Sequence, residues 1–450
     1  MSTDEQQITA SLATAEGQSH MKRYPRVLVV TPEALHTPSA TGLTLASLFA
    51  DWPPDRLANL YYNGAPPPSD LCGHAWQVRV HTFPHRAANR IAYTLLGRVG
   101  TGVVPGLEST KPMDVLVSRL GLDFIALADM LGSKLDPNTL SEIARFQPDI
   151  VYSILWGFTG MRVTIQAASI AKCPIVPHFM DDWPATQYQE AFLSIIWRRF
   201  VVCRLYRIMA DVSIGLAICE DMAEEYARLY KIPFASFMRC LDLSEFAHRP
   251  KTGPHACLRL VYAGGLYLGR AKTLAAVAAA LDQLCSEGFD AVLIIHSPRN
   301  EDEGVFHSAL ASFRSAFWGG SLQPSEVASV LQNSDVAVHV ESFDPRAESY
   351  TRLSVSTKFP SYMAAGLPIL AVGPATIAST RYVQRHGIGI AVTEPDLALI
   401  ASAIREVSQP ERWSFFSARA YEVCQAQHAA TTVRDQFATL LINAARPSTL

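Results

Sequence analysis

Long apolar runs are absent from this sequence, and so is any excess of positive charge. No uninterrupted apolar stretch reaches the roughly 18–20 residues that a helix needs to cross a bilayer. Lysine and arginine number 38 against 41 aspartate and glutamate, for a formal net charge of −3, which gives no general attraction to nucleic acid. The first 20 residues are polar and lack the apolar core of a signal peptide. We therefore expect a disordered leader over residues 1–21 and a cytoplasmic protein.

Paired cysteines are also lacking. The 8 cysteines are scattered along the chain, and none shows the spacing of a metal-binding or redox pair. Several lie in apolar surroundings, as Cys219 does directly after the apolar segment 214–218. This distribution predicts reduced, buried thiols rather than disulfides or a metal site.

What the sequence does contain is a repeated alternation of strand and helix patterns. Its 450 residues are 49% hydrophobic and 18% charged, which suits two or three domains with sizeable cores. Residues 26–30 predict a buried strand, and a loop of small residues with Gly42 leads from it to a helix, as in a doubly wound sheet. The same pattern restarts at residue 258. We predict two doubly wound, Rossmann-like α/β domains over residues 22–240 and 258–409, a linker over 241–257 and a helical tail over 410–450.

Other segments predict single elements. Residues 57–62 and 77–83 read as strands. Residues 137–146 read as a helix, for which Asn138 is the expected cap. Residues 341–356 are polar and predict a long loop.

The most informative stretch is the segment 354–374. It predicts a polar loop, a short helix that ends at Gly366, a turn at Pro368 and a buried strand. The loop carries Ser356, Thr357 and Lys358 at the start of the helix. Hydroxyls, free backbone N–H groups and a lysine at a helix N-terminus can hold a diphosphate. An ordinary solvated helix cap is the alternative interpretation.

A second basic loop follows the first strand of the second predicted domain. It begins with Gly264 and Gly265 and ends with Arg270 and Lys272. The loop has neither the dinucleotide fingerprint nor the lysine–hydroxyl end of a P-loop. Its glycines allow close approach of the backbone, while Arg270 and Lys272 can contact phosphate. A tight turn with exposed basic residues is the alternative.

Polar side chains gather after the predicted strand 174–179 of the first domain. His178 lies near its end, and Asp181 and Asp182 follow it. Because α/β sheets place their chemistry at the carboxyl ends of strands, these residues are candidates for catalysis. A helix-capping aspartate and a histidine held by core hydrogen bonds are the alternative interpretation.

Residues 188–210 show a helical pattern rich in aromatic side chains and arginines. Such a helix can lie on an anionic membrane and give the protein a peripheral membrane contact. It can equally be a core helix with solvated arginines, which we favour.

Several of these segments resemble the retaining glycosyltransferases of the GT-B fold, family 4. The stretch 364–371, Ala-Ala-Gly-Leu-Pro-Ile-Leu-Ala, is similar to the family's nucleotide-binding segment, and Ser356-Thr357-Lys358 looks like the Ser-x-Lys of one subgroup. The strand pattern 335–340 also matches, and the resemblance spans roughly residues 25–445. It implies two Rossmann-like domains facing a cleft, the first for the acceptor and the second for the donor. It also implies that the tail 410–450 packs back on the first domain.

The resemblance further implies a nucleotide-diphosphate sugar, UDP- or GDP-linked, as co-substrate. Arg270 occupies the place of the family's basic loop residue, and His178 or Asp181 would lie near the transferred sugar. Gly42 would lie near the donor phosphates, and Gly320 near the base. With the local chemistry, this gives a predicted donor site of Gly42, Gly264, Gly265, Arg270, Lys272, Gly320, Glu341, Glu348, Ser356, Thr357 and Lys358.

The sequence departs from the family at one prominent place. The family usually carries a pair of glutamates at fixed spacing, and the corresponding positions here are Leu353 and Ser361. Glu341 and Glu348 are available in a shifted register. Which residue holds the sugar and the ribose is therefore left open.

The resulting expectation is transfer of a sugar, with retention, to a glycan, a lipid-linked molecule or a small metabolite. Arg270 and Lys358 would neutralise the departing diphosphate, so that no metal is expected. His178 or Asp181 would stabilise the sugar or orient the acceptor. Three alternatives remain open: a nucleotide-sugar epimerase on the same fold, a non-catalytic nucleotide-sugar-binding subunit of a synthesis complex, and a phosphorylase.

Overall fold

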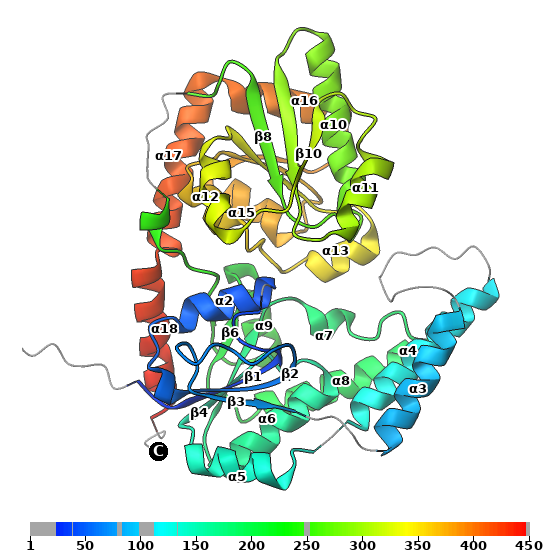
Figure 1. The fold of residues 1–450 in the computed structure, drawn as a ribbon, viewed down its shortest axis with the longest axis vertical. Coiled ribbons are helices and arrows are strands. Elements are labelled where there is room, and N and C mark those ends of the chain that lie inside the picture. The colour runs from blue at the N-terminus through cyan, green and yellow to red at the C-terminus, as the bar shows by residue number, and fades with distance from the viewer. Residues whose placement is uncertain are drawn as a thin grey trace, which may run out of the picture.

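The computed structural model describes residues 24–37, 39–78, 83–98, 112–132, 134–246 and 253–446. Figure 1 shows two α/β units, one above the other, with the C-terminal helices running along one side of both. The expected leader over residues 1–21 lies outside the described residues, as does the middle of the expected linker.

The first unit contains a seven-stranded sheet in which every neighbouring pair is parallel. The strand order is β3-β2-β1-β4-β5-β6-β7. Strand order reverses beside β1, which lies between β2 and β4, as in a doubly wound sheet. The strands are β1 (Val27–Glu33), β2 (Leu57–Asn63), β3 (His74–Gln77), β4 (Ile150–Ser153), β5 (Ile175–Phe179), β6 (Gly215–Ala217) and β7 (Phe234–Ser236).

Helices connect these strands. They are α2 (Ala40–Phe49), α3 (Phe83–Arg98), α4 (Pro112–Met130), α5 (Pro137–Phe146), α6 (Gly157–Ala171), α7 (Trp183–Thr186), α8 (Ser194–Met209) and α9 (Glu220–Tyr230), with short 3-10 turns at Pro54–Arg56 and Leu243–Glu245.

Three local predictions for this unit are corrected. The strand expected at 77–83 lies at His74–Gln77, and Phe83 already begins α3. The cap of α5 is Asp136, whose carboxylate accepts from the backbone N–H groups of Asn138 and Thr139, because an aspartate before a proline at the first helical position is a better cap. The helix expected from residue 188 begins only at Ser194.

The second unit has a six-stranded parallel sheet in the order β10-β9-β8-β11-β12-β13. Its strands are β8 (Leu258–Ala263), β9 (Ala291–His296), β10 (Ala316–Gly320), β11 (Val336–Val340), β12 (Ile369–Val372) and β13 (Gly389–Val392). Its helices are α10 (Arg270–Ser286), α11 (Glu301–Ala309), α12 (Pro324–Gln332), α13 (Pro345–Thr351), α14 (Phe359–Ala364), α15 (Ala378–His386) and α16 (Leu397–Ser408).

The stretch around Gly366 has the expected local structure. Gly366 has a φ of +65° after α14, a conformation that glycine adopts at little cost. The N–H of Leu367 donates to the carbonyl of Tyr362, and β12 is buried along its whole length. The polar segment 341–356, expected as a loop, contains the helix α13 instead. Its start is fixed by Asp344, which caps the backbone N–H groups of Arg346 and Ala347.

The chain ends in two helices that contact both units, α17 (Pro410–Gln427) and α18 (Ala430–Ala444). Trp413 of α17 belongs to the core of the second unit, and Phe437 of α18 belongs to the core of the first. Where α17 passes to α18, Leu241 donates its N–H to the carbonyl of His428 and accepts from the N–H of Ala430. The two passages of the chain between the units therefore lie side by side. We propose the division 22–240, 241–257, 258–409 and 410–450 on this basis.

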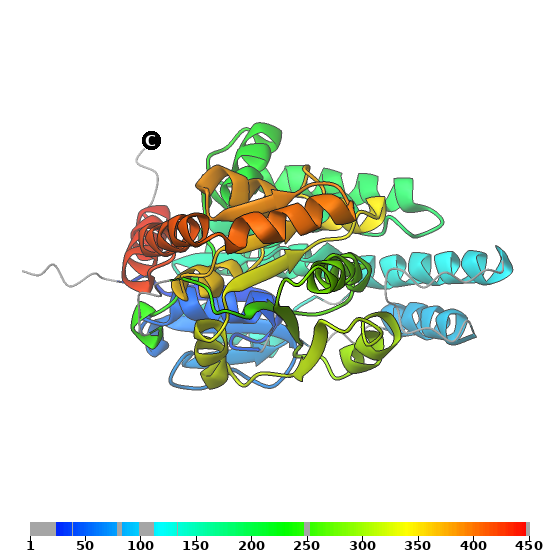
Figure 2. The same ribbon diagram turned by 90° about the horizontal axis from the view of Figure 1, so that it is seen from above.

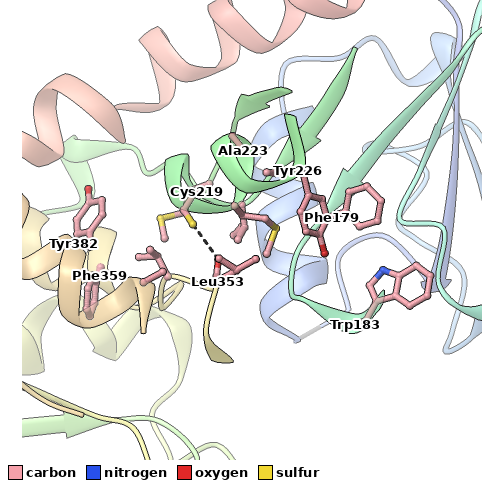
Figure 3. Close-up of a cluster of buried hydrophobic side chains, with 14 of the residues drawn as sticks. Phe179, Trp183, Cys219, Ala223, Tyr226, Leu353, Phe359 and Tyr382 are labelled. Atoms are coloured by element: carbon pink, nitrogen blue, oxygen red, sulfur yellow. Dashed lines mark hydrogen bonds between the residues drawn. The ribbon is translucent and has the colours of Figure 1, made fainter. Parts of the chain in front are cut away.

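One buried apolar cluster includes side chains from both units (Figure 3). Leu353 of the second unit accepts a hydrogen bond at its carbonyl from the Cys219 thiol of the first, at 3.1 Å. The labelled members are Phe179, Trp183, Cys219, Ala223, Tyr226, Leu353, Phe359 and Tyr382. Apolar surface shared in this way stabilises the contact between the two units.

No helix in the described ranges combines the length and the hydropathy that a membrane span requires.

Candidate functional site

The guanidinium of Arg270 lies against the carboxylate of Glu341 at the carboxyl edge of the second sheet. Arg270 begins α10 directly after Gly269, which has a φ of +73°, and Glu341 follows β11. Nε and Nη2 donate to the two carboxylate oxygens at 3.1 and 3.0 Å. The side chains are only 13% and 5% exposed. Burial disfavours the charge on Arg270, but Glu341 outweighs it and the pKa of Arg270 is raised. Arg270 is therefore a fixed, permanent cation at this edge.

The amine of Lys358 lies close to the Arg270–Glu341 ion pair. Lys358 precedes α14, and its Nζ lies 4.7 Å from the centre of the Tyr262 ring. A Cβ at Gly264 would lie 2.1 Å from this Nζ, so that glycine leaves the room for the lysine. Burial first, and then the charge of Arg270, lower the pKa of Lys358 to about 7 against an opposing effect of Glu341. The amine is therefore partly deprotonated at neutral pH when no anion is present.

The glycine-rich loop after β8 is held by close contacts of its own. The N–H of Gly264 donates to the carbonyl of His296 at 2.8 Å. A Cβ at Gly265 would lie 2.4 Å from the ring of Tyr267. That ring has the guanidinium carbons of Arg270 and Arg299 at 5.0 Å from its centre. Arg299, which follows β9, is therefore a further cation that shares the Tyr267 ring with Arg270, and it was not among the predicted site residues.

His339 lies next to Glu341 of the ion pair. It was not among the site residues predicted from the sequence. It is buried in β11, and its Nε2 is 3.5 Å from the Glu341 carboxylate. Burial, followed by the charges of Lys358 and Arg270, lowers the pKa of His339 well below its usual value. The imidazole beside Glu341 is therefore neutral, and neither of its ring nitrogens has a hydrogen-bond partner among the described residues.

Asp181 and Asp182 follow β5 in the first unit and are both held by residues of the second. Asp181 accepts from the N–H of Trp183 at 3.0 Å and from the hydroxyl of Tyr350 at 3.1 Å. Asp182 accepts from Arg352 at 3.2 Å, and from Tyr226 of its own unit. Burial raises the pKa of Asp181 to about 6.

Tyr350 connects this acidic pair with the basic cluster. Burial raises the pKa of its hydroxyl, Asp181 raises it further, and Arg270 acts in the opposite direction. The charges of Asp181 and Arg270 therefore both act on one tyrosine, although they belong to different units. Neither Tyr350 nor Arg352 gave a signal in the sequence beyond its place in a polar stretch.

His178 lies inside the first sheet rather than at its edge. The residue is fully buried, and its Nδ1 shares a hydrogen bond with the hydroxyl of Tyr152. Its Nε2 has no partner among the described residues. Burial lowers the pKa of His178 to about 3, so the ring is neutral at physiological pH. His178 is thus enclosed in the sheet, whereas Asp181 follows the strand and accepts from Tyr350 of the second unit.

Two predicted donor-site residues, Ser356 and Thr357, directly precede Lys358. The hydroxyl of Ser356 accepts from the backbone N–H of Lys358 at 3.4 Å, and the N–H of Ser356 donates to Ser379. Thr357 is half-buried between them. The N-cap position of α14 is Lys358 itself, and no side chain makes a capping hydrogen bond there.

Four other predicted donor-site residues do not join the Arg270–Lys358 cluster. Gly42 lies in the first turn of α2, where a Cβ would be 2.3 Å from the Thr37 carbonyl. Gly320 ends β10 with a φ of +73° and open space around it. The carboxylate of Glu348 accepts from the hydroxyl of Thr376, and Lys272 is exposed on α10.

Within the described part of the chain, no group of three or more His, Cys, Asp or Glu residues could hold a metal ion. Two open cavities, of about 620 and 570 Å³, lie along α18 and away from the Arg270–Lys358 pair.

No protein-family model matches the sequence, and no curated protein matches it. Solved structures do. A glycosyltransferase from Rickettsia africae ESF-5 matches with a TM-score of 0.58 at 10% identity, over 95% of this chain and 100% of that one. WaaG, a glycosyltransferase involved in lipopolysaccharide biosynthesis, matches with a TM-score of 0.55 at 12% identity, over 92% and 99%. A trehalose-6-phosphate protein from E. coli, bound with UDP-2-fluoro glucose, matches with a TM-score of 0.59 at 10% identity, over 93% and 99%.

At such low identity these similarities establish the fold alone. The chain has the GT-B architecture, in which two Rossmann-like domains face each other. The first and second units described above are its N-terminal and C-terminal domains.

Proposed function

We propose that this chain is a retaining glycosyltransferase that moves a sugar from a nucleotide-diphosphate sugar to an acceptor. The observation that carries the proposal is that two cationic side chains, Arg270 and Lys358, lie at the carboxyl edge of the C-terminal sheet. Asp181 of the other domain reaches the same junction through its hydrogen bond with Tyr350. This is where a doubly wound sheet binds its ligand. The GT-B fold supports the same conclusion, because the similar structures named above are described as glycosyltransferases.

Arg270 and Lys358 have complementary roles towards a diphosphate. Glu341 takes Nε and Nη2 of Arg270, so Nη1 is the part of the guanidinium left to donate to a phosphate. Lys358 supplies a compact point charge, which becomes fully protonated when an anion binds beside it. Together they stabilise the charge that develops on the leaving diphosphate.

The reaction balances without a further reagent. The bond between the anomeric carbon and the diphosphate oxygen breaks with its electron pair going to the diphosphate. A hydroxyl oxygen of the acceptor bonds to the same face of that carbon, and its proton passes to the departing diphosphate. The chain's contribution is to orient both partners and to neutralise charge.

We assign the sugar-facing role to Asp181 rather than to His178. Asp181 lies at the domain junction beside Tyr350, whereas His178 is enclosed in the sheet. A carboxyl group at this position can accept a hydrogen bond from a sugar or an acceptor hydroxyl. The acceptor class, whether glycan, lipid-linked or small molecule, is left open by these contacts.

A thermal-shift experiment with UDP, GDP, ADP and TDP tests the donor site. The proteins are wild type, Lys358→Met and the control Lys272→Met, which removes an exposed lysine from the neighbouring helix. A ligand at about 100 times its dissociation constant adds roughly 2.7 kcal/mol of stability. We expect one diphosphate, UDP or GDP, to raise the melting temperature of wild type and of Lys272→Met, and to have little effect on Lys358→Met. The similarity to a structure bound with UDP-2-fluoro glucose favours UDP.

If none of the four diphosphates stabilises the wild type, the proposed donor site is wrong. If a diphosphate binds but the corresponding donor is never cleaved with any acceptor offered, a nucleotide-sugar-binding subunit replaces the enzyme. The absence of the family's glutamate pair at Leu353 and Ser361 is the observation that keeps this second function in view.

A further inference from the structure

The helix α8 is buried on one side only. Trp197, Val201 and Leu205 pack into the core of the N-terminal domain. The remaining surface of the helix carries large apolar side chains that face solvent, and Ile195 is 84% exposed. The exposed apolar residues of this segment are Phe192, Leu193, Ile195, Ile196, Phe200, Val202 and Tyr206. So much apolar surface on one helix indicates a binding partner.

A second exposed apolar group lies on α3 and α4. These two helices pack against each other and project beyond the sheets (Figures 1 and 2). Met113 of α4 is 68% exposed. The exposed apolar residues of this pair are Ile91, Tyr93, Met113, Val115, Leu116 and Leu120.

Hydrogen bonds join α4 to the beginning of α8. Asp123 of α4 accepts from the backbone N–H of Leu193 at 2.9 Å and from the indole N–H of Trp197 at 2.7 Å. The N–H of Phe192 donates to the carbonyl of Arg119. The two apolar groups are therefore held together in one surface, which we call the α4–α8 face and which comprises α3, α4 and residues 192–209.

Among the described side chains of the α4–α8 face, the exposed charged groups are arginines. The helix α8 has four arginines and no acidic residue. Arg198 and Arg199 are exposed, as are Arg90 and Arg119 of the neighbouring helices. None of these four makes an ion pair with a carboxylate of the described residues. In contrast, Asp123 is buried, and its Oδ1 accepts both of the hydrogen bonds described above.

We infer that the α4–α8 face docks on the surface of an anionic lipid membrane. Apolar side chains next to unpaired arginines are suited to the boundary between acyl chains and headgroups, where the arginines reach lipid phosphates. The opposite charge of anionic headgroups complements the arginines and strengthens the binding. The centre of a protein–protein interface is usually apolar and poor in charged residues. On the α4–α8 face, arginines instead lie among the exposed apolar side chains.

The position of the face fits the proposed reaction. The segment from Asp182 through α7 leads directly from the end of β5 to α8. If the proposed function holds, a membrane held here brings a lipid-borne acceptor to Asp181. Membrane binding itself is independent of that function, since it requires no donor and no turnover.

Vesicle flotation tests the inference. The full chain is mixed with vesicles of pure phosphatidylcholine or with vesicles in which about a third of the lipid is phosphatidylglycerol. We expect binding to the anionic vesicles only, and weaker binding at high salt. The variant Arg198→Gln/Arg199→Gln should bind about thirtyfold more weakly, and Ile195→Ser/Phe200→Ser should also lose binding.

Two matched control variants show whether the loss of vesicle binding is specific to the α4–α8 face or follows from the loss of any exposed arginine or phenylalanine. Arg145→Gln/Arg228→Gln removes two exposed arginines from α5 and α9 of the same domain. Phe415→Ser replaces an exposed phenylalanine of α17 that is 57% exposed, close to the 52% of Phe200. Both should bind vesicles like wild type, and all variants should melt like wild type.

Failure of the wild type to float with anionic vesicles overturns the inference. Equal loss of binding in the controls also overturns it, because the effect would then not belong to this face. Self-association of the wild type that is abolished by Ile195→Ser/Phe200→Ser, without vesicle binding, would instead identify the face as a contact between copies of the chain. A diphosphate that stabilises the protein in the absence of vesicle binding would leave the proposed function standing.

Discussion

Lys358 shares a confined space with a guanidinium, a carboxylate and the face of an aromatic ring. Replacing it with methionine removes one of two neighbouring cations and keeps the volume of the side chain. We expect Lys358→Met to lower the turnover of the donor by a factor of about 100 or more. Its melting temperature should not fall, because the repulsion from Arg270 is also removed. Enzyme rates and thermal melting, with Lys272→Met as the control, measure both effects. An unchanged rate would remove Lys358 from the proposed mechanism.

The same amine should make donor binding sensitive to pH. Its pKa is about 7 in the free protein, and a bound diphosphate stabilises the protonated form. As the pH rises above 7, a proton must be taken up for each ligand bound, so the affinity should fall by up to about tenfold per pH unit. Calorimetric titrations at pH 7, 8 and 9 check this for wild type. The dependence should disappear in Lys358→Met, and an equally steep fall in that variant would assign it to another group.

The raised pKa of Asp181 predicts that the stability of the protein depends on pH. Burial raises its pKa from 3.8 to about 6, so the folded state favours the protonated form. Its stabilising contribution is complete below about pH 4 and is lost as the pH rises through 6. The variant Asp181→Asn, which stays neutral, should therefore be more stable than wild type at pH 7.5, by on the order of 2–3 kcal/mol. Urea unfolding at pH 4, 5, 6 and 7.5 should show this difference vanish at low pH, and a constant difference would contradict the prediction.

Single site residues could be predicted from the sequence where a suitable side chain stands at a predicted loop next to a strand or a helix start. Arg270 and Lys358 could be selected because each follows a loop beside a predicted strand or helix start. Tyr350 and Arg352 could not, because their role depends on the approach of another domain, which leaves no periodic trace in the chain. The different surroundings of His178, which is enclosed in the sheet, and Asp181, which reaches the other domain, could not be predicted either. Sequence spacing does not tell whether a side chain at a strand end points outward or into the sheet.

The helix α18 completes the core of the N-terminal domain from the far end of the sequence. Phe437 packs edge-to-face with Phe49 and Phe237 at centroid distances of 5.0 and 5.3 Å, and it is fully buried. We expect Phe437→Ala to destabilise the protein by about 3–5 kcal/mol. Denaturant unfolding measures this, with Phe415→Ala as the control for an exposed phenylalanine. A loss below about 1 kcal/mol would mean that α18 contributes little to the core.

Long or strongly patterned elements were predictable, and short polar ones were not. The helix α5 and the turn at Gly366 have clear stop signals and were placed correctly. The helix α13 was missed because Thr351 is its only fully buried residue, so it has no apolar period to detect. β7 has only three residues, and no strand was predicted at that place. The fold class could be predicted because it rests on the alternation of many elements and tolerates such errors.

The two domains share buried apolar surface and ion pairs, which couples their unfolding. Besides the cluster in Figure 3, Asp221 of the N-terminal domain pairs with Arg381 and Arg385 of the other. We expect a single heat-absorption peak in scanning calorimetry, with equal calorimetric and van't Hoff enthalpies. Leu353→Ala, which weakens the shared cluster, should lower or broaden that peak. Two well-separated peaks in the wild type would show that the domains unfold independently.

The side-by-side passages of the chain at Leu241 and Ala429 have a mechanical consequence. A single flexible tether would let one domain swing, twist and slide relative to the other. Two passages that are hydrogen-bonded to each other at one flank restrict twisting and sliding, and they favour rotation about an axis through both. Opening and closing of the junction between Asp181 and Arg270 is then a motion with one degree of freedom. Each closure would bring the same atoms back into register.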